Sequence, residues 1–274
     1  MGTMKRRKAR ADALKRLTPA EFVLWKDKNR LATGIDPASH DPAALLSMAR
    51  VLASMFEEAK RTGTLDTTVK FLYDTVNATN AGLADVPVAC HRGCSHCCHT
   101  WVSAFPPEIL ATAKLLRARG EAVMAMVRVA HDQTKAYDFE TRDQHPTPCP
   151  LLDQDLCSIY DARPVNCRLA ASADAGICAR TYHNLTQENV PTPLMNIVAR
   201  SAYGFALVAG LRKAGLPYET YEWNAGLNRA LETTEAEQRW LAGENIFAGI
   251  LQEHAPVLND PRMEELYARA FANP

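Results

Sequence analysis

The sequence predicts a mostly α protein in which helical flanks surround a loop-rich segment that carries the cysteines. Apolar residues recur at three- and four-residue steps through both flanks, which is the spacing of amphipathic helices. No region alternates apolar and polar residues long enough to predict a sheet. All eight cysteines of the 274 residues lie between Cys90 and Cys178. Thiol ligands are therefore available in one central segment and in neither flank.

Three helices are predicted before the cysteines. Thr18 and Glu21 have the spacing of a capping box, which opens a helix over about 19–32. A second helix begins after Asp41, where a proline follows and the apolar residues take up helical spacing. A third is expected over about 66–79.

The remaining helices follow the first cysteines. Residues 105–120 begin with prolines and a glutamate and stop at a glycine, a complete helix signature, and 122–137 continue the helical pattern. Residues 142–182 contain four prolines without sustained periodicity, which predicts loops and one short helix. Thr234 with Glu237 predicts a second capping box. Further helices are expected over about 193–214, 218–232, 235–253 and 261–271.

This pattern divides the chain into three regions: 1–85 and 183–274 as helical regions and 86–182 as the cysteine region. The three regions could also form one compact domain. Close to half of the residues are apolar, so a single core can form without disulfide or metal cross-links.

The charge balance argues against nucleic acid and membrane partners. Lys+Arg and Asp+Glu number 31 each, so the formal net charge is zero. The basic opening, MKRRKARADALKR, is interpreted as a solvated helix or tail. The apolar stretch 195–211 is short for a bilayer and contains Arg200, which favours a core helix. No apolar segment typical of a signal peptide follows the basic residues, so we expect a cytoplasmic protein with reduced thiols.

The first four cysteines have the spacing of a metal site. Cys90, Cys94, Cys97 and Cys98 read C-x3-C-x2-C-C. Cys94 and Cys97 can bind one metal across a tight turn, and Gly93 permits the left-handed backbone of such turns. Because side chains of adjacent residues diverge, Cys98 either reaches the same centre through a backbone bend or serves a second one.

The other four cysteines are spaced too widely to lie in one turn. Each would therefore contribute one thiolate to a metal site that the first four cysteines begin to form. Eight thiolates allow two four-coordinate sites, or one cluster with spare thiols. Zinc and an iron–sulfur cluster, including [4Fe-4S], are both compatible with soft ligands. The predicted metal ligands are Cys90, Cys94, Cys97, Cys98, Cys149, Cys157, Cys167 and Cys178.

Two arginines near these cysteines are candidate cofactor-binding residues. Arg163 and Arg168 place positive charge beside the thiolates, which would lower thiol pKa values and offset the negative charge. Histidines nearby could substitute as ligands. These are His91, His96, His99 and His145.

The motif resembles a known family. C-x3-C-x2-C-C, the stretch TWVSAFPPEIL, and then CPLL and CSIYDARPVNCR are similar to the YkgJ-type cysteine cluster proteins, a zinc- or iron-chelating family, over about residues 88–170. The resemblance implies metal-ligand roles for the first seven cysteines, and Arg163, Pro164 and Arg168 match its recurrent positions. Cys178 lies outside the motif, so its assignment rests on proximity.

The resemblance leaves several functions open. The site could be structural, holding zinc or iron, or could be an iron–sulfur site that supports modification of an unidentified protein or small molecule. One branch of the family is similar to flagellin lysine N-methylase, which implies S-adenosylmethionine as a cofactor, although no G-x-G-x-x-G loop occurs here. The spacing of Cys90, Cys94 and Cys97 also occurs in radical S-adenosylmethionine enzymes, but no βα alternation accompanies it. A redox sensor with a Cys97–Cys98 or a Cys94–Cys97 disulfide is a further alternative.

Overall fold

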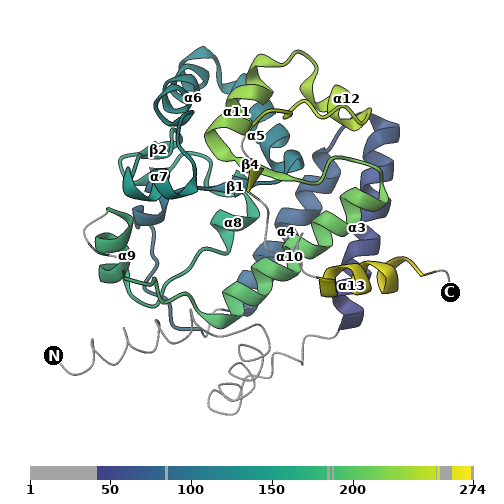
Figure 1. The fold of residues 1–274 in the computed structure, drawn as a ribbon, viewed down its shortest axis with the longest axis horizontal. Helices are drawn as coiled ribbons and strands as arrows, with labels where there is room; N and C mark the ends of the chain where they lie inside the picture. The colour runs from purple at the N-terminus through teal and green to yellow at the C-terminus, as the bar shows by residue number, and fades with distance from the viewer. Residues whose placement is uncertain are drawn as a thin grey trace, which may run out of the picture.

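Helices surround the cysteine segment in the computed structural model (Figure 1). The structure describes residues 42–83, 86–183, 186, 188–250, 252–253 and 261–272. The helix expected over 19–32 and the basic N-terminal segment lie outside these residues. The predicted mostly α fold is confirmed. The longer helices are α3 (Pro42–Thr62), α4 (Asp66–Gly82), α5 (Pro106–Arg119), α6 (Glu121–Thr134), α10 (Leu194–Lys213), α11 (Trp223–Glu232) and α13 (Pro261–Phe271).

Helices α3 and α10 pack along each other at the lower right of Figure 1. Gly210 lets them approach closely, because a Cβ added there would lie 2.9 Å from Cβ of Leu52. Leu52, Phe56 and Leu207 are fully buried in the core between them. By length and composition alone α10 could cross a membrane, yet half of the apolar window within it is buried against the rest of the protein.

Helices α5, α6 and α11 pack together above this pair (Figure 1). Gly226 of α11 lies against Ile109 of α5, and Arg117 donates to the carbonyls of Ala230 and Thr233 at 2.7 and 2.9 Å. These bonds satisfy carbonyl groups that the end of α11 leaves without helical partners.

The residues expected to begin a helix at 218 instead form a strand. β4 (Thr220–Glu222) pairs antiparallel with β1 (Ser103–Ala104) and β5 (Gln252–Glu253), in the order β1-β4-β5. All three residues of β4 are buried, including the polar Thr220 and Glu222, so the burial of this strand cannot be recognised from an apolar pattern in the sequence. α11 starts only at Trp223.

The helix expected over 235–253 is shorter than predicted. α12 (Ala236–Leu241) gives way to turns with positive φ at Gly243 and Gly249. The capping box predicted from Thr234 and Glu237 is also wrong, because Glu237 Oε1 accepts the N–H of Leu65 at 2.6 Å. The Glu237 carboxylate therefore accepts a hydrogen bond from Leu65, which is distant in the sequence, rather than capping the start of its own helix.

The segment 142–182 is more ordered than the sequence predicted. In place of one short helix it contains a hairpin and several helical turns. These are α7 (Phe139–Gln144), β2 (Leu152–Asp153), β3 (Leu156–Cys157), η3 (Tyr160–Ala162), α8 (Val165–Arg168) and α9 (Ala175–Tyr182), with the 3-10 turn η2 (His96–His99) earlier in the chain.

The cysteine segment shares its core with the flanking helices. Leu151, Ile159, Val165 and Leu169 are buried in the same cluster as residues of α3, α4, α5 and α10. The backbone that carries the cysteines is therefore anchored by ordinary apolar packing.

Candidate metal centre

The first four cysteines lie on a tight loop and the 3-10 turn η2. Gly93 has a φ of 85°, as the sequence predicted for this position. The N–H of Cys94 donates to the carbonyl of His91 at 3.0 Å and closes the turn. Cys97 and Cys98 follow within η2.

The hairpin β2–β3 brings two later cysteines to η2. The N–H of Cys149 donates to the carbonyl of Cys98 at 2.8 Å. Cys157 lies opposite Leu152 in the hairpin, and the N–H of Leu152 donates to the carbonyl of Cys149 at 3.0 Å. Backbone bonds thus set the positions of both thiols relative to Cys98.

Cys167 is positioned by a buried carboxylate. Glu108 Oε1 accepts the N–H of Val165, the first residue of α8, at 2.6 Å, and its Oε2 accepts the N–H of Phe105 at 3.1 Å. This side chain links the start of α5 to the short helix that carries Cys167. Burial raises the pKa of Glu108 to about 7, although both hydrogen bonds oppose that shift.

Cys178 lies on α9, which packs against η2. Asp174 caps α9 by accepting the N–H of Ile177 at 3.0 Å. The N–H of Ser172 donates to Sγ of Cys90 at 3.3 Å, and the Ser172 side chain also bonds the Cys178 thiol. Ser172 therefore connects the first cysteine of the segment to the last.

Electrostatic interactions link the thiols, and we use them to assign two groups. Burial raises the pKa values of Cys90 and Cys178, and repulsion from Cys94 and Cys97 raises each of them further. We call Cys90, Cys94, Cys97 and Cys178 the outer thiol group.

The second set lies around the hairpin and α8. Burial raises the pKa of Cys149 to about 11, with a further contribution from Cys157. Burial also raises the pKa of Cys167 well above its ordinary value, with contributions from Cys149, Cys97 and Cys157. We call Cys98, Cys149, Cys157 and Cys167 the inner thiol group.

Cys97 lies where the two groups meet. A hydrogen bond from the Cys98 thiol lowers the pKa of Cys97 to about 7, and the positive charges of Arg163 and Arg200 lower it further. The same contact raises the pKa of Cys98. Cys97 is thus the thiol most readily ionised at neutral pH among those with a resolved shift.

The thiols are not arranged as a preformed metal site. Within the described part of the chain, no group of three or more His, Cys, Asp or Glu side chains is placed so that it could hold a metal as it stands. The donor set nevertheless fits a thiolate-bound metal, because four soft ligands in each group match the ligands of zinc and iron sites.

The two predicted arginines occupy different environments. Arg163 stacks over the ring of Tyr160, 3.6 Å from its centroid, and its charge lowers the pKa values of Cys97, Cys157 and Cys167. It lies where an arginine would offset the charge of bound thiolates.

Arg168 makes structural contacts instead. Its guanidinium donates to the carbonyls of Arg163 at 2.6 Å and of Asp161, and to Asn77 Oδ1 at 2.8 Å. It also stacks over the ring of Tyr73, 4.0 Å from the centroid. These contacts fasten α8 to α4.

Arg142 was missed by the sequence reasoning. Its side chain is 2% exposed and donates to the carbonyl of Thr147 at 3.0 Å, while its Nε and Nη1 have no hydrogen-bond partner among the described residues. Cys149 and Glu222 raise its pKa, against the larger effect of burial. It lies in a polar stretch that offers no signal of burial.

The predicted histidines separate in the structure. His91 Nδ1 lies 2.9 Å from the carbonyl of Arg92, and His145 stacks against Tyr137. His96 and His99 instead gather with His183, which sequence reasoning did not select.

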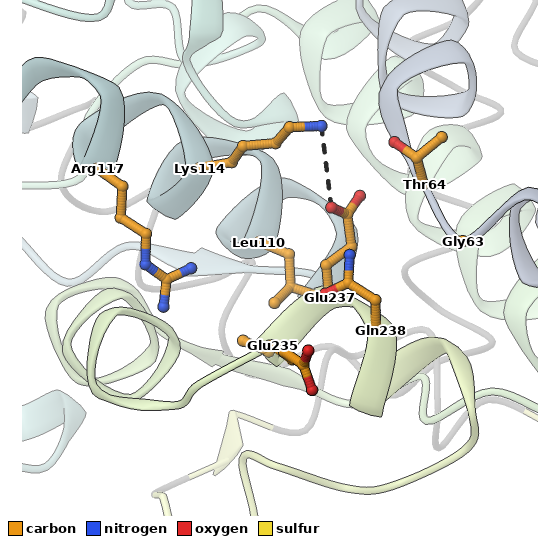
Figure 2. A pocket seen from close by; sticks show the side chains of 9 residues that line it. Gly63, Thr64, Leu110, Lys114, Arg117, Glu235, Glu237 and Gln238 are labelled. Carbon is orange, nitrogen blue, oxygen red and sulfur yellow. Dashed lines mark ion pairs between the residues drawn. The ribbon is translucent and has the colours of Figure 1, made fainter.

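A cavity of about 280 Å³ lies away from the thiols, between α5 and α12. In Figure 2 the Lys114 side chain points toward Glu237, with 3.9 Å between Nζ and Oε2. Lys114 also pairs with Asp66 at 2.7 Å. Its charge is neutralised within the protein, and no cysteine lines this cavity.

The fold and the thiols define a class: a helical protein with a cysteine-based metal-binding segment. Residues 89–190 match the CxxCxxCC family, described as "Putative zinc- or iron-chelating domain". The match confirms the predicted resemblance for this segment, and its range includes Cys178. No curated protein and no solved structure was found to match the chain.

Proposed function

We propose that the chain holds two metal ions, one in the outer and one in the inner thiol group, in sites that are structural. The observation that supports this proposal is that Cys90 and Cys178 interact electrostatically with Cys94 and Cys97, whereas Cys167 interacts with Cys149 and Cys157. Cys97 acts on thiols of both groups.

Four thiolates complete the coordination of a tetrahedral zinc or iron ion. Such a site has no open position for a substrate, so the division favours a structural role over catalysis. Four thiolates around a divalent ion carry a net charge of about −2, and Arg163, Arg200 and Arg142 lie where they would offset it.

The test is the metal and acid-labile sulfide content of anaerobically purified protein. We expect two ions of zinc or iron per chain and no sulfide. Cys90→Ser should remove the outer ion and Cys167→Ser the inner ion, each leaving the other in place. His91→Ala, in the same loop as Cys90, is the matched control and should retain both.

A single shared centre gives a different result. If either cysteine variant lost all of the metal, the two-site assignment would be wrong. Sulfide with visible absorption would identify an iron–sulfur cluster instead. Circular dichroism of each variant separates loss of a ligand from loss of the fold.

A further inference from the structure

Three imidazoles gather beside the thiol groups. His96 and His99 are three residues apart on η2, a spacing that places side chains on the same face of a 3-10 turn. His183 ends α9, which packs on η2. Its ring centroid lies 5.4 Å from that of His96 and 4.8 Å from that of His99.

The nitrogen positions fit a shared cation. His96 Nδ1 and His183 Nε2 are 3.2 Å apart. Two nitrogens bound to one tetrahedral zinc at about 2.0–2.1 Å would be separated by about 3.3 Å. The pair therefore already has the spacing of two ligands of one ion.

His99 can supply the third nitrogen. Its Nδ1 lies 3.1 Å from the carbonyl of Ser95, so the proton is placed on Nδ1 and Nε2 keeps a lone pair. Metal-binding histidines commonly hydrogen-bond a carbonyl in this way. The His183 ring contacts each of the other two rings, and His99 must rotate for its Nε2 to face the other two nitrogens.

The surroundings also favour a cation. Ser95 donates to Asp155 Oδ1 at 2.5 Å, and the Asp155 carboxylate interacts electrostatically with His183. His183 is exposed, so an ion can reach the site from solvent.

We propose that His96, His99 and His183 form a nitrogen site for a borderline divalent cation such as Zn²⁺. This site is separate from the thiolate sites, because it uses none of the cysteines.

The test adds Co²⁺ anaerobically to the protein as purified, with its thiol-bound metal in place. We expect one further cobalt ion per chain, with the visible bands of a nitrogen and oxygen site and without thiolate-to-cobalt charge transfer. Because each removes a ligand, His183→Ala and His96→Ala should weaken this binding by about tenfold or more. His91→Ala, an exposed histidine of the same segment, should leave it unchanged.

Three outcomes would overturn the site: no further cobalt binds, His183→Ala binds it as tightly, or charge transfer shows that thiols bind it. Metal lost in Cys90→Ser and Cys167→Ser reports on the thiolate sites, whereas cobalt binding lost in His183→Ala reports on the nitrogen site, so failure of one proposal does not imply failure of the other.

Discussion

Glu108 is a buried carboxyl group whose ionisation should affect stability. Its pKa in the folded protein, about 7, lies above the ordinary value of 4.5. The folded state therefore binds the proton more tightly than the unfolded chain does. Its contribution to the free energy of unfolding is complete below about pH 4.5 and is lost as the pH rises through 7. The full effect is about 3 kcal/mol.

Glu108→Gln tests this contribution. The amide oxygen can accept only one of the two N–H groups that Glu108 binds, so at pH 5 the variant should be less stable than the wild type by about 1 kcal/mol. The deficit should shrink or reverse by pH 8, because the variant has no carboxyl group to ionise. Urea unfolding at several pH values measures the difference, and Glu140→Gln, at an exposed position, is the control. A deficit that is independent of pH would contradict the assignment.

At the same scale, the sequence predicted cysteine ligands better than their surroundings. Cysteines cluster along the chain, so their positions are visible without the fold. Arg163 and Arg168 look equivalent in sequence, yet Arg163 faces the thiols whereas Arg168 contacts Asn77 and Tyr73 on α4. Arg163 precedes α8 and Arg168 ends it, and which of the two side chains faces the thiols depends on tertiary packing, which the spacing does not encode.

At the scale of elements, the contact between α3 and α10 depends on one glycine. A Cβ at position 210 would lie 2.9 Å from Cβ of Leu52 and 3.1 Å from the backbone nitrogen of Ala53, and that backbone cannot easily move. Gly210→Ala should therefore destabilise the protein by about 1–3 kcal/mol despite the better helix propensity of alanine.

Gly82→Ala is the matched control. Gly82 is the last residue of α4 and has no neighbouring atom that a Cβ would meet within 4 Å. Its substitution should change the free energy of unfolding by less than about 0.5 kcal/mol. Chemical denaturation of both variants provides the comparison. Equal stability of the two would show that α3 and α10 can separate without cost.

α3 was predictable because apolar spacing repeats over several turns, and α5 because prolines and a glutamate begin the helix and Gly120 ends it. The strands were not, since β1 and β4 contain only two and three residues. The β2–β3 hairpin turns through Gln154 and Asp155 with positive φ. Glycine or asparagine normally marks such a turn, and neither residue is present here, so the hairpin could not be predicted.

At the scale of the whole molecule, the cysteine segment is held in two ways. Leu151, Ile159, Val165 and Leu169 anchor it to the common core, while the thiol groups would be held by metal. Loss of metal should therefore loosen the loops around the thiols and leave the helices on either side folded.

Hydrogen exchange with and without a chelator tests this division. After chelation, exchange should rise in residues 90–100 and 149–178, whereas α3 and α10 should remain protected. Restoring zinc should reverse the change. Global exchange after chelation would instead make the metal necessary for the whole fold, and unchanged exchange would contradict metal-supported structure altogether.

Acid should promote the same loosening. Burial raises the pKa of Cys149 to about 11 and raises that of Cys167 as well, so these thiols are protonated in the metal-free protein and must release protons on binding metal. Affinity should consequently fall as the pH is lowered, and at pH 6 less chelator should be needed to produce the exchange pattern than at pH 8. Calorimetric zinc binding in buffers of different ionisation enthalpy measures the protons released, and binding without proton release would show that the buried thiols are not the ligands.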